Sequence, residues 1–300
     1  MGCTVVVGLD GSGGSIRALH WAAAAAQRMD ATLQPVFAWE YPALALLPFP
    51  AGLPVPPQEA MQADAEVRAQ GLVESAGALD GLDTVAEPLV LQGTPGRVLC
   101  DAAASADLLV IGSRGLGSVK GVLLGSVSAH CANAAPCPVV IVPEDAPDEV
   151  GAEGGADGEG TGLVLVGVDG SASSDAAVKW ADQWAPEGSV LLLMHVWNVP
   201  ITTDASALTF DVEAMDDAAK RLLDAAADLV TDHEVETLRV RGDARMELQR
   251  RSEDADLVVI GARGHSMFER FLMGSVASHT VHHLSKPTVV VRAPSDRSPE

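Results

Sequence analysis

The sequence predicts a doubly wound α/β fold, present twice in tandem. Short apolar runs rich in β-branched residues alternate with alanine-rich stretches, and each half of the 300-residue chain contains five such runs. Apolar strands separated by helices are typical of a parallel sheet covered on both faces. Five strands joined by right-handed crossovers form an open, Rossmann-like sheet, which binds ligands at the carboxyl ends of its strands.

The elements follow from the apolar runs and from the stretches between them. In the first half, strands are expected at 4–9, 32–39, 84–92, 107–112 and 138–143. Helices are expected between them at about 15–29, 58–79, 95–105 and 126–135. In the second half, strands are expected at 163–168, 189–197, 236–242, 256–261 and 287–292, with helices in the corresponding gaps.

A repeated glycine-rich segment indicates a duplicated domain. The pattern G-x2-G-x9-G-S occurs in GSRGLGSVKGVLLGS (112–126) and again in GARGHSMFERFLMGS (261–275). Each segment begins at the last residue of an expected strand. VVVGLDGS (5–12) is likewise repeated as VLVGVDGS (164–171). We therefore expect two nucleotide-binding domains of the same kind, at 1–145 and 161–294, joined by an acidic, glycine-rich linker at 146–160. The first domain contains a proline-rich insert at 41–57, which we interpret as a variable surface loop, with a lid or a partner-binding loop as the alternatives.

Charge and cysteine content restrict the class of protein. The formal net charge is −22, so nucleic acid and anionic membranes are poor partners. The first residues carry no basic segment of a secretory signal, and the proline-broken insert is too short to span a bilayer. The four cysteines lack a metal-ligand spacing and are expected to be free thiols, as in a reducing compartment. These features predict a cytoplasmic protein.

The glycine-rich loops are candidate phosphate sites. Glycine admits a ligand close to the backbone, and the first amides of a helix lack intrahelical partners. In the first domain the candidates are Gly112, Gly115, Gly125, Ser126, Val127 and Ser128, with Arg114 as a possible source of positive charge. In the second domain they are Gly261, Gly264, Gly274, Ser275, Val276 and Ser278, with Arg263. The alternative is an ordinary strand–loop–helix connection in which Ser126 caps the helix.

In each half, one aspartate directly follows the first expected strand. Asp10 follows Gly8 and Leu9, and Asp169 follows Gly167 and Val168. A carboxylate at this edge of the sheet can accept hydrogen bonds from ribose hydroxyls or an adenine amino group. The alternative role for both aspartates is helix capping.

Standard nucleotide motifs are absent from the sequence. There is no G-x4-G-K-[ST] motif, and the glycines after the first strand do not fit G-x-G-x-x-G. No pair of base and nucleophile recurs in both halves. These absences favour binding over catalysis. Slow ATP hydrolysis and a nucleotide-free interaction module are the alternative functions, and the repeated glycine loop argues against the second.

With these motifs, the chain resembles a tandem universal stress protein of the ATP-binding subclass. The resemblance depends on V-G-x-D-G-S, on G-x2-G-x9-G-S, and on PCPVVIV (136–142) and KPTVVV (286–291). It covers nearly the whole chain apart from the linker and the insert.

The resemblance implies a regulatory role in stress adaptation and a bound adenine nucleotide: ATP, with or without Mg²⁺, or else cAMP or AMP. Adenine and ribose would contact Asp10 and the backbone of Ala38 in one domain, and Asp169 and the backbone of Val196 in the other. The phosphates would bind the glycine loops. The resemblance also implies antiparallel pairing of 138–142 with 287–291 within the chain, with a homodimer as a further arrangement. Glu269, in the second loop, would repel a triphosphate, so the first site is expected to be the stronger one.

Overall fold

The computed structural model describes residues 2–41, 57–75, 84–116, 124–144, 162–198, 211–264, 273–283 and 285–293. The chain divides into two units, Met1–Ala152 and Glu153–Glu300. Most of the insert predicted at 41–57 and all of the linker predicted at 146–160 lie outside the described residues. No helix among the described residues is long and apolar enough to cross a membrane.

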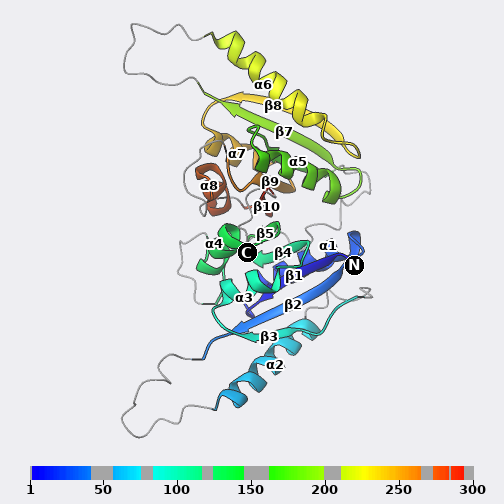
Figure 1. Cartoon of the computed structure of the whole chain (residues 1–300), viewed down its shortest axis with the longest axis vertical. Helices are drawn as coiled ribbons and strands as arrows, with labels where there is room; N and C mark the ends of the chain where they lie inside the picture. The colour runs from blue at the N-terminus through cyan, green and yellow to red at the C-terminus, as the bar shows by residue number, and fades with distance from the viewer. Residues whose placement is uncertain are drawn as a thin grey trace, which may run out of the picture. The chain divides into compact units, whose positions relative to one another are not determined.

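The first unit is an open parallel sheet with helices in its crossovers (Figure 1). Its strand order is β3-β2-β1-β4-β5, and β1 pairs in parallel with both β2 and β4. The elements, in chain order, are β1 (Thr4–Leu9), α1 (Gly13–Arg28), β2 (Thr32–Trp39), α2 (Gln58–Ser75), β3 (Leu89–Gln92), α3 (Pro95–Ala102), β4 (Leu108–Gly112), α4 (Ser126–Ala134) and β5 (Val139–Val142). The predicted fold class is confirmed for this unit.

The second unit repeats this topology. Its strand order is β10-β9-β6-β7-β8, and β6 pairs in parallel with both β7 and β9. Its elements are β6 (Leu163–Gly167), α5 (Ala172–Trp184), β7 (Val190–Trp197), α6 (Val212–Ala227), β8 (Glu234–Arg241), α7 (Ala244–Ser252), β9 (Leu257–Gly261), α8 (Ser275–His283) and β10 (Thr288–Val291).

One strand is shorter than the sequence predicts. The run 84–92 was expected to be a single strand, but β3 begins only at Leu89, and upstream of it Val85 forms an isolated bridge to Leu33. Pro88 stands between the two pieces. Because proline has no amide hydrogen to donate to a ladder, it interrupts the pairing.

The central strands provide the core and position the ligand edge. Val5, Val6 and Val7 of β1 and Val110 of β4 are at most 1% exposed. Because β1 and β4 are parallel neighbours, both end at the same edge of the sheet, where α1 begins and the glycine loop leaves β4. The second unit brings the ends of β6 and β9 together in the same way.

Candidate functional site

Asp10 shapes the turn from β1 into α1. Its Oδ1 accepts a hydrogen bond from the Ser12 amide at 2.9 Å. Ser12 is the N-cap of α1, and its hydroxyl oxygen accepts from the Ser15 amide at 3.1 Å. Ser12, and not Asp10, therefore caps α1.

Asp10 also holds the glycine loop. Its Oδ2 accepts a hydrogen bond from the Leu116 amide at 2.8 Å, which joins the end of β1 to the loop that follows β4. A Cβ atom on Gly115 would collide with Asp10 Oδ2, so only glycine allows this approach.

A second close approach places the loop against α1. A Cβ on Gly112 would lie 2.6 Å from the carbonyl carbon of Gly14, and one on Gly14 would lie 2.8 Å from the Arg114 carbonyl oxygen. The Ser12 hydroxyl donates to that same carbonyl at 3.4 Å. The start of the loop is thus fixed by backbone packing on the first turn of α1.

The N-terminus of α4 faces the site, although its cap differs from the prediction. The N-cap is Gly125, without a side-chain cap, and Ser126 is the first helical residue; the expectation that Ser126 caps the helix is wrong. The Ala129 amide makes the first helical bond, to Gly125 O at 2.9 Å, so the amides of Ser126, Val127 and Ser128 precede it. The Ser128 hydroxyl donates within the loop, to Gly112 O at 2.8 Å and Ser113 O at 3.1 Å.

The Arg114 side chain forms an ion pair at the edge of the site. Its Nη1 lies 2.8 Å from Glu144 Oε2 in an ion pair just beyond β5. Arg114 also lines the pocket. The donors available to an anion here are mainly backbone amides, as the absence of a Walker lysine predicts.

These elements surround a cavity of about 370 Å³ in the first unit. All eleven residues predicted for this domain line it: Gly8, Leu9, Asp10, Ala38, Gly112, Arg114, Gly115, Gly125, Ser126, Val127 and Ser128. The sequence did not single out the rest of the wall, which consists of Ser15, Val36, Pro95, Leu99, Ile111 and Leu116. Three of these, Val36, Leu99 and Ile111, are apolar core residues whose only sequence signal is their hydrophobicity.

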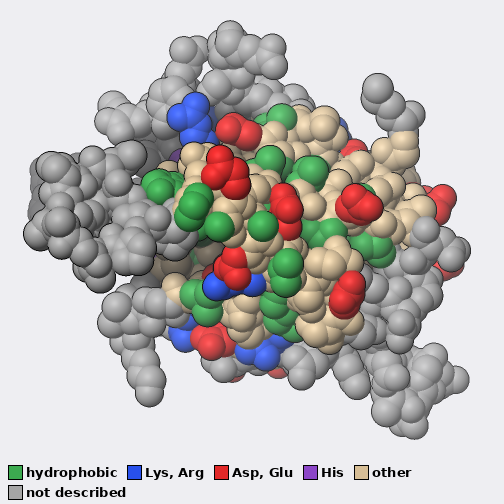
Figure 2. Space-filling model, turned by 90° about the horizontal axis from the view of Figure 1, so that it is seen from below, with side chains coloured by type: hydrophobic (Ala, Val, Ile, Leu, Met, Phe, Trp, Pro, Cys, Tyr) green, Lys and Arg blue, Asp and Glu red, His purple; other side chains and the backbone are tan. Residues whose placement is uncertain are grey.

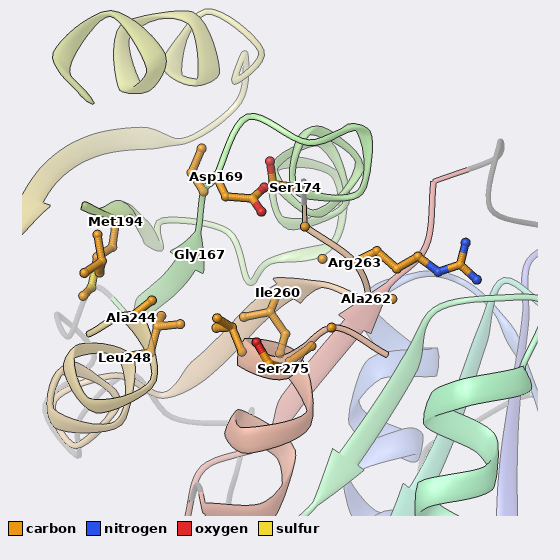
Figure 3. A pocket seen from close by; sticks show the side chains of 17 residues that line it. Gly167, Asp169, Ser174, Met194, Ala244, Leu248, Ile260, Ala262, Arg263 and Ser275 are labelled. Carbon is orange, nitrogen blue, oxygen red and sulfur yellow. The ribbon is translucent and has the colours of Figure 1, made fainter. Parts of the chain in front are cut away.

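The second unit repeats the same bonds. Asp169 Oδ1 accepts from the Ser171 amide at 2.9 Å, and the Ser171 hydroxyl donates to Arg263 O at 3.0 Å. A Cβ on Gly264 would collide with Asp169 Oδ2, as at Gly115. Figure 3 shows Asp169, Ser174 and Ser275 around this pocket, with the Arg263 side chain extending away from them.

Ten of the eleven residues predicted for the second site line its pocket: Gly167, Val168, Asp169, Val196, Gly261, Arg263, Gly264, Gly274, Ser275 and Val276. Ser278 does not. Its amide makes the first helical bond of α8, to Gly274 O at 2.8 Å, and Ala277 occupies the position that Ser128 has in the first domain. The prediction placed Ser278 one residue too far along the helix. Glu269, the predicted repulsive residue, lies outside the described residues.

The universal stress protein family model matches residues 3–143 and again residues 162–292. The chain belongs to the universal stress protein family. A universal stress protein of Mycolicibacterium smegmatis is 30% identical, with 96% of each chain covered, and so is one of Mycobacterium tuberculosis. Among solved structures, a universal stress protein of Archaeoglobus fulgidus is 19% identical with a TM-score of 0.65, covering 97% of this chain and 98% of its own. At that identity the likeness concerns the fold.

The two pockets of this tandem universal stress protein differ in size. The second encloses about 220 Å³ against about 370 Å³ for the first. Gly8 pairs with Val36 and Gly167 pairs with Met194, so Met194 stands where the first pocket has Val36. Val196 likewise stands in place of Ala38, so both changes put larger side chains into the second pocket.

No group of three His, Cys, Asp or Glu side chains that could hold a metal ion occurs in the part of the chain that the structure describes. The four cysteines form no disulfide, and Cys100, Cys131 and Cys137 are buried. Each pocket is lined by one aspartate, one arginine, serines, glycines and apolar residues.

Proposed function

We propose that this protein is a regulatory adenine-nucleotide-binding module with its principal site in the first domain and ATP as the leading ligand. The proposal depends on three sequence features that meet at one pocket in each domain. In each domain the aspartate after the first strand, the glycine loop and the N-terminus of the following helix surround one pocket.

The residues present fit a nucleotide. Val36, Pro95 and Leu99 offer apolar surface to a base, beside the backbone of Ala38 at the end of β2. Asp10 keeps lone pairs on both oxygens that can accept from ribose hydroxyls. The amides of Ser126, Val127 and Ser128 and the positive end of α4 suit phosphate oxygens.

The volumes support unequal sites. A cavity of about 370 Å³ falls within the range of about 300–1,000 Å³ that is usual for small-molecule sites, whereas about 220 Å³ falls below it. The second domain is therefore proposed to bind more weakly, or to take a smaller ligand such as AMP or cAMP.

The site supports binding better than hydrolysis. Asp10 is the one carboxylate that lines the first pocket among the described residues, and hydrogen bonds from the Ser12 and Leu116 amides already engage it. Phosphoryl transfer needs metal carboxylates and a group that positions water. Mg²⁺, if it accompanies ATP, would be held mainly by the phosphates themselves.

The direct test is to purify the protein, denature it with acid and identify released small molecules by mass spectrometry. The proposal predicts an adenine nucleotide, at no more than two per chain. Release of none, together with no binding of ATP, AMP or cAMP at millimolar concentration, would overturn it.

A further inference from the structure

An exposed groove in the first unit lies away from the nucleotide pocket, between α2 and the outer strand β3. It is lined by Glu66, Val67, Gln70, Gly71, Glu74, Glu87, Pro88 and Val90. On the α2 side of the groove Val67 is 73% exposed. Leu89 and Leu91 of β3 are 42% and 38% exposed, on the opposite face of the sheet from Val90. In Figure 2, which views the chain from the end where Figure 1 shows α2 and β3, hydrophobic and acidic side chains are interspersed and basic ones are few.

Within the part of the chain that the structure describes, no strand pairs with the outer edge of β3. β3 is the last strand beyond β2 in the first unit. The Gly93 amide donates to Trp39 O of β2 at 2.9 Å, and alternate residues direct their backbone groups to opposite sides, so Val90 and Gln92 face outward. The Val90 carbonyl accepts a hydrogen bond from the Gln62 side chain at 3.4 Å.

The equivalent edge of the second unit is protected, which provides an internal comparison. β8 carries Glu234, Glu236, Arg239 and Arg241 along its length, whereas β3 reads LVLQ without a charge. Charged side chains on an edge strand discourage the addition of another strand. The first domain lacks this protection in the same position of the same fold.

The charge of the groove defines what it would accept. Glu66 and Glu74 receive hydrogen bonds from Gln62 and Gln70 at 2.8 and 2.9 Å, which orient the carboxylates without neutralising them. Within the described residues, no basic side chain forms an ion pair with Glu66, Glu74 or Glu87. Three uncompensated carboxylates beside apolar side chains and an open strand edge match an extended segment with alternating basic and apolar residues.

We propose that the α2–β3 groove is a docking site at which a basic, extended segment of a partner protein adds to β3 as an outer strand. A second copy of this chain is a poor occupant. Its net charge is −22, and its densest basic run, RMELQRR (245–251), is folded into α7. The site is independent of nucleotide binding.

The test uses a capped peptide of about six residues, a typical strand length, in which lysine alternates with valine. Its binding to the full chain is followed by NMR amide shifts and by calorimetry. The control peptide has the same sequence with alternate backbone amides N-methylated, which keeps the charge and removes edge hydrogen bonds.

Saturable binding is expected, with the largest shifts at the Val90 and Gln92 amides and no saturable binding of the N-methylated control. The double variant E66K/E74K should lower the affinity about tenfold, while E234K/E236K, with the same charge change at the β8 edge, should leave it within about twofold. Val90→Pro removes the outward-facing Val90 donor, together with a side chain that lines the groove, and should also weaken binding.

Three results would overturn the proposal: no saturable binding, equal binding of the N-methylated peptide, or equal losses in both double variants. The last two would show attraction to an acidic surface without strand addition. Circular dichroism of each variant confirms that the fold is intact.

Discussion

Asp10 Oδ2 accepts a hydrogen bond from the amide of Leu116 at 2.8 Å, across 106 positions of sequence. The other oxygen of the same carboxylate accepts from the Ser12 amide at 2.9 Å. One side chain thus sets the start of α1 and ties the glycine loop to the end of β1. Its substitution should change the shape of the pocket as well as remove a ligand contact.

Asp10→Ala should lower the affinity of the first domain for ATP at least about tenfold, because hydrogen bonds to charged groups contribute about 1.5–3 kcal/mol each. Calorimetric titration measures the effect. Asp101→Ala removes the same charge from an exposed position of the same domain, where Asp101 Oδ2 lies 3.8 Å from Arg97 Nε. This control should leave the affinity close to that of the unmodified protein. Equal effects of both variants would mean that overall charge, and not the Asp10 contacts, controls binding.

Gly115→Ala should lower both nucleotide affinity and stability, because its Cβ would collide with Asp10 Oδ2. We expect a loss of about 1–3 kcal/mol in the free energy of unfolding, measured by urea denaturation. The matched control is Gly71→Ala in α2, where an added Cβ meets nothing within 4 Å. Alanine there should stabilise the helix by up to about 1 kcal/mol and leave ATP binding unchanged.

The size difference between the pockets predicts that exchanging their wall residues will change the ATP affinity of each site. The first test is made in a Gly125→Val background, in which valine crowds the phosphate position of the first site. There, Met194→Val combined with Val196→Ala should enlarge the second pocket and raise its affinity for ATP. The reverse pair, Val36→Met with Ala38→Val, should weaken the first site. Calorimetry of the two double variants checks both directions, and an unchanged affinity in both would show that these side chains do not limit access.

A buried carboxylate in the second unit predicts a pH dependence of stability. Asp182 accepts hydrogen bonds from the Thr231 amide and hydroxyl, the Asp232 amide and the His233 ring at 2.8–3.2 Å. Burial alone raises the pKa of Asp182, but these hydrogen bonds outweigh it, and the pKa lies below its ordinary value. This stabilisation is therefore complete above the unfolded-state pKa, about 3.9, and is lost as the pH falls through the lower folded-state pKa.

Asp182→Asn should accordingly lower the free energy of unfolding by about 2–4 kcal/mol near neutral pH, because an amide group cannot accept all of these hydrogen bonds. The difference from the unmodified protein should shrink below about pH 4, as measured by thermal denaturation across a pH series. Asp232→Asn, at an exposed neighbouring position, should change stability by less than about 0.5 kcal/mol. A difference that persists unchanged at pH 3 would contradict this interpretation of the Asp182 contacts.

Local pattern was enough to predict the fold, because β1, β4, β6 and β9 are apolar runs that end at a glycine or directly before an Asp-Gly-Ser turn. The same spacing located Asp10, the glycine loop and the helix amides. It could not distinguish Gly125 from Ser126 as the cap of α4, since both residue types are compatible with that position.

The remaining features depend on tertiary contacts. Met194 and Leu99 enter the pocket walls because of strand register and helix packing, which apolar residues in a sequence do not reveal. The pairing of Arg114 with Glu144 joins residues 30 positions apart, and the contacts of Asp182 join α5 to the turn before β8. Antiparallel pairing of 138–142 with 287–291, a homodimer and a cytoplasmic location stay predictions.

The most direct measurement is a calorimetric titration of nucleotide-free protein with ATP, run in parallel on the Gly125→Val variant. A Cβ on Gly125 meets no atom closer than 3.4 Å, and circular dichroism checks that the valine variant is folded. The expected result is one stronger site per chain, lost in Gly125→Val, with any second site weaker and unaffected. No heat of binding at millimolar ATP, or full binding retained by a folded Gly125→Val protein, would contradict the assignment of the 112–128 loop as the phosphate site.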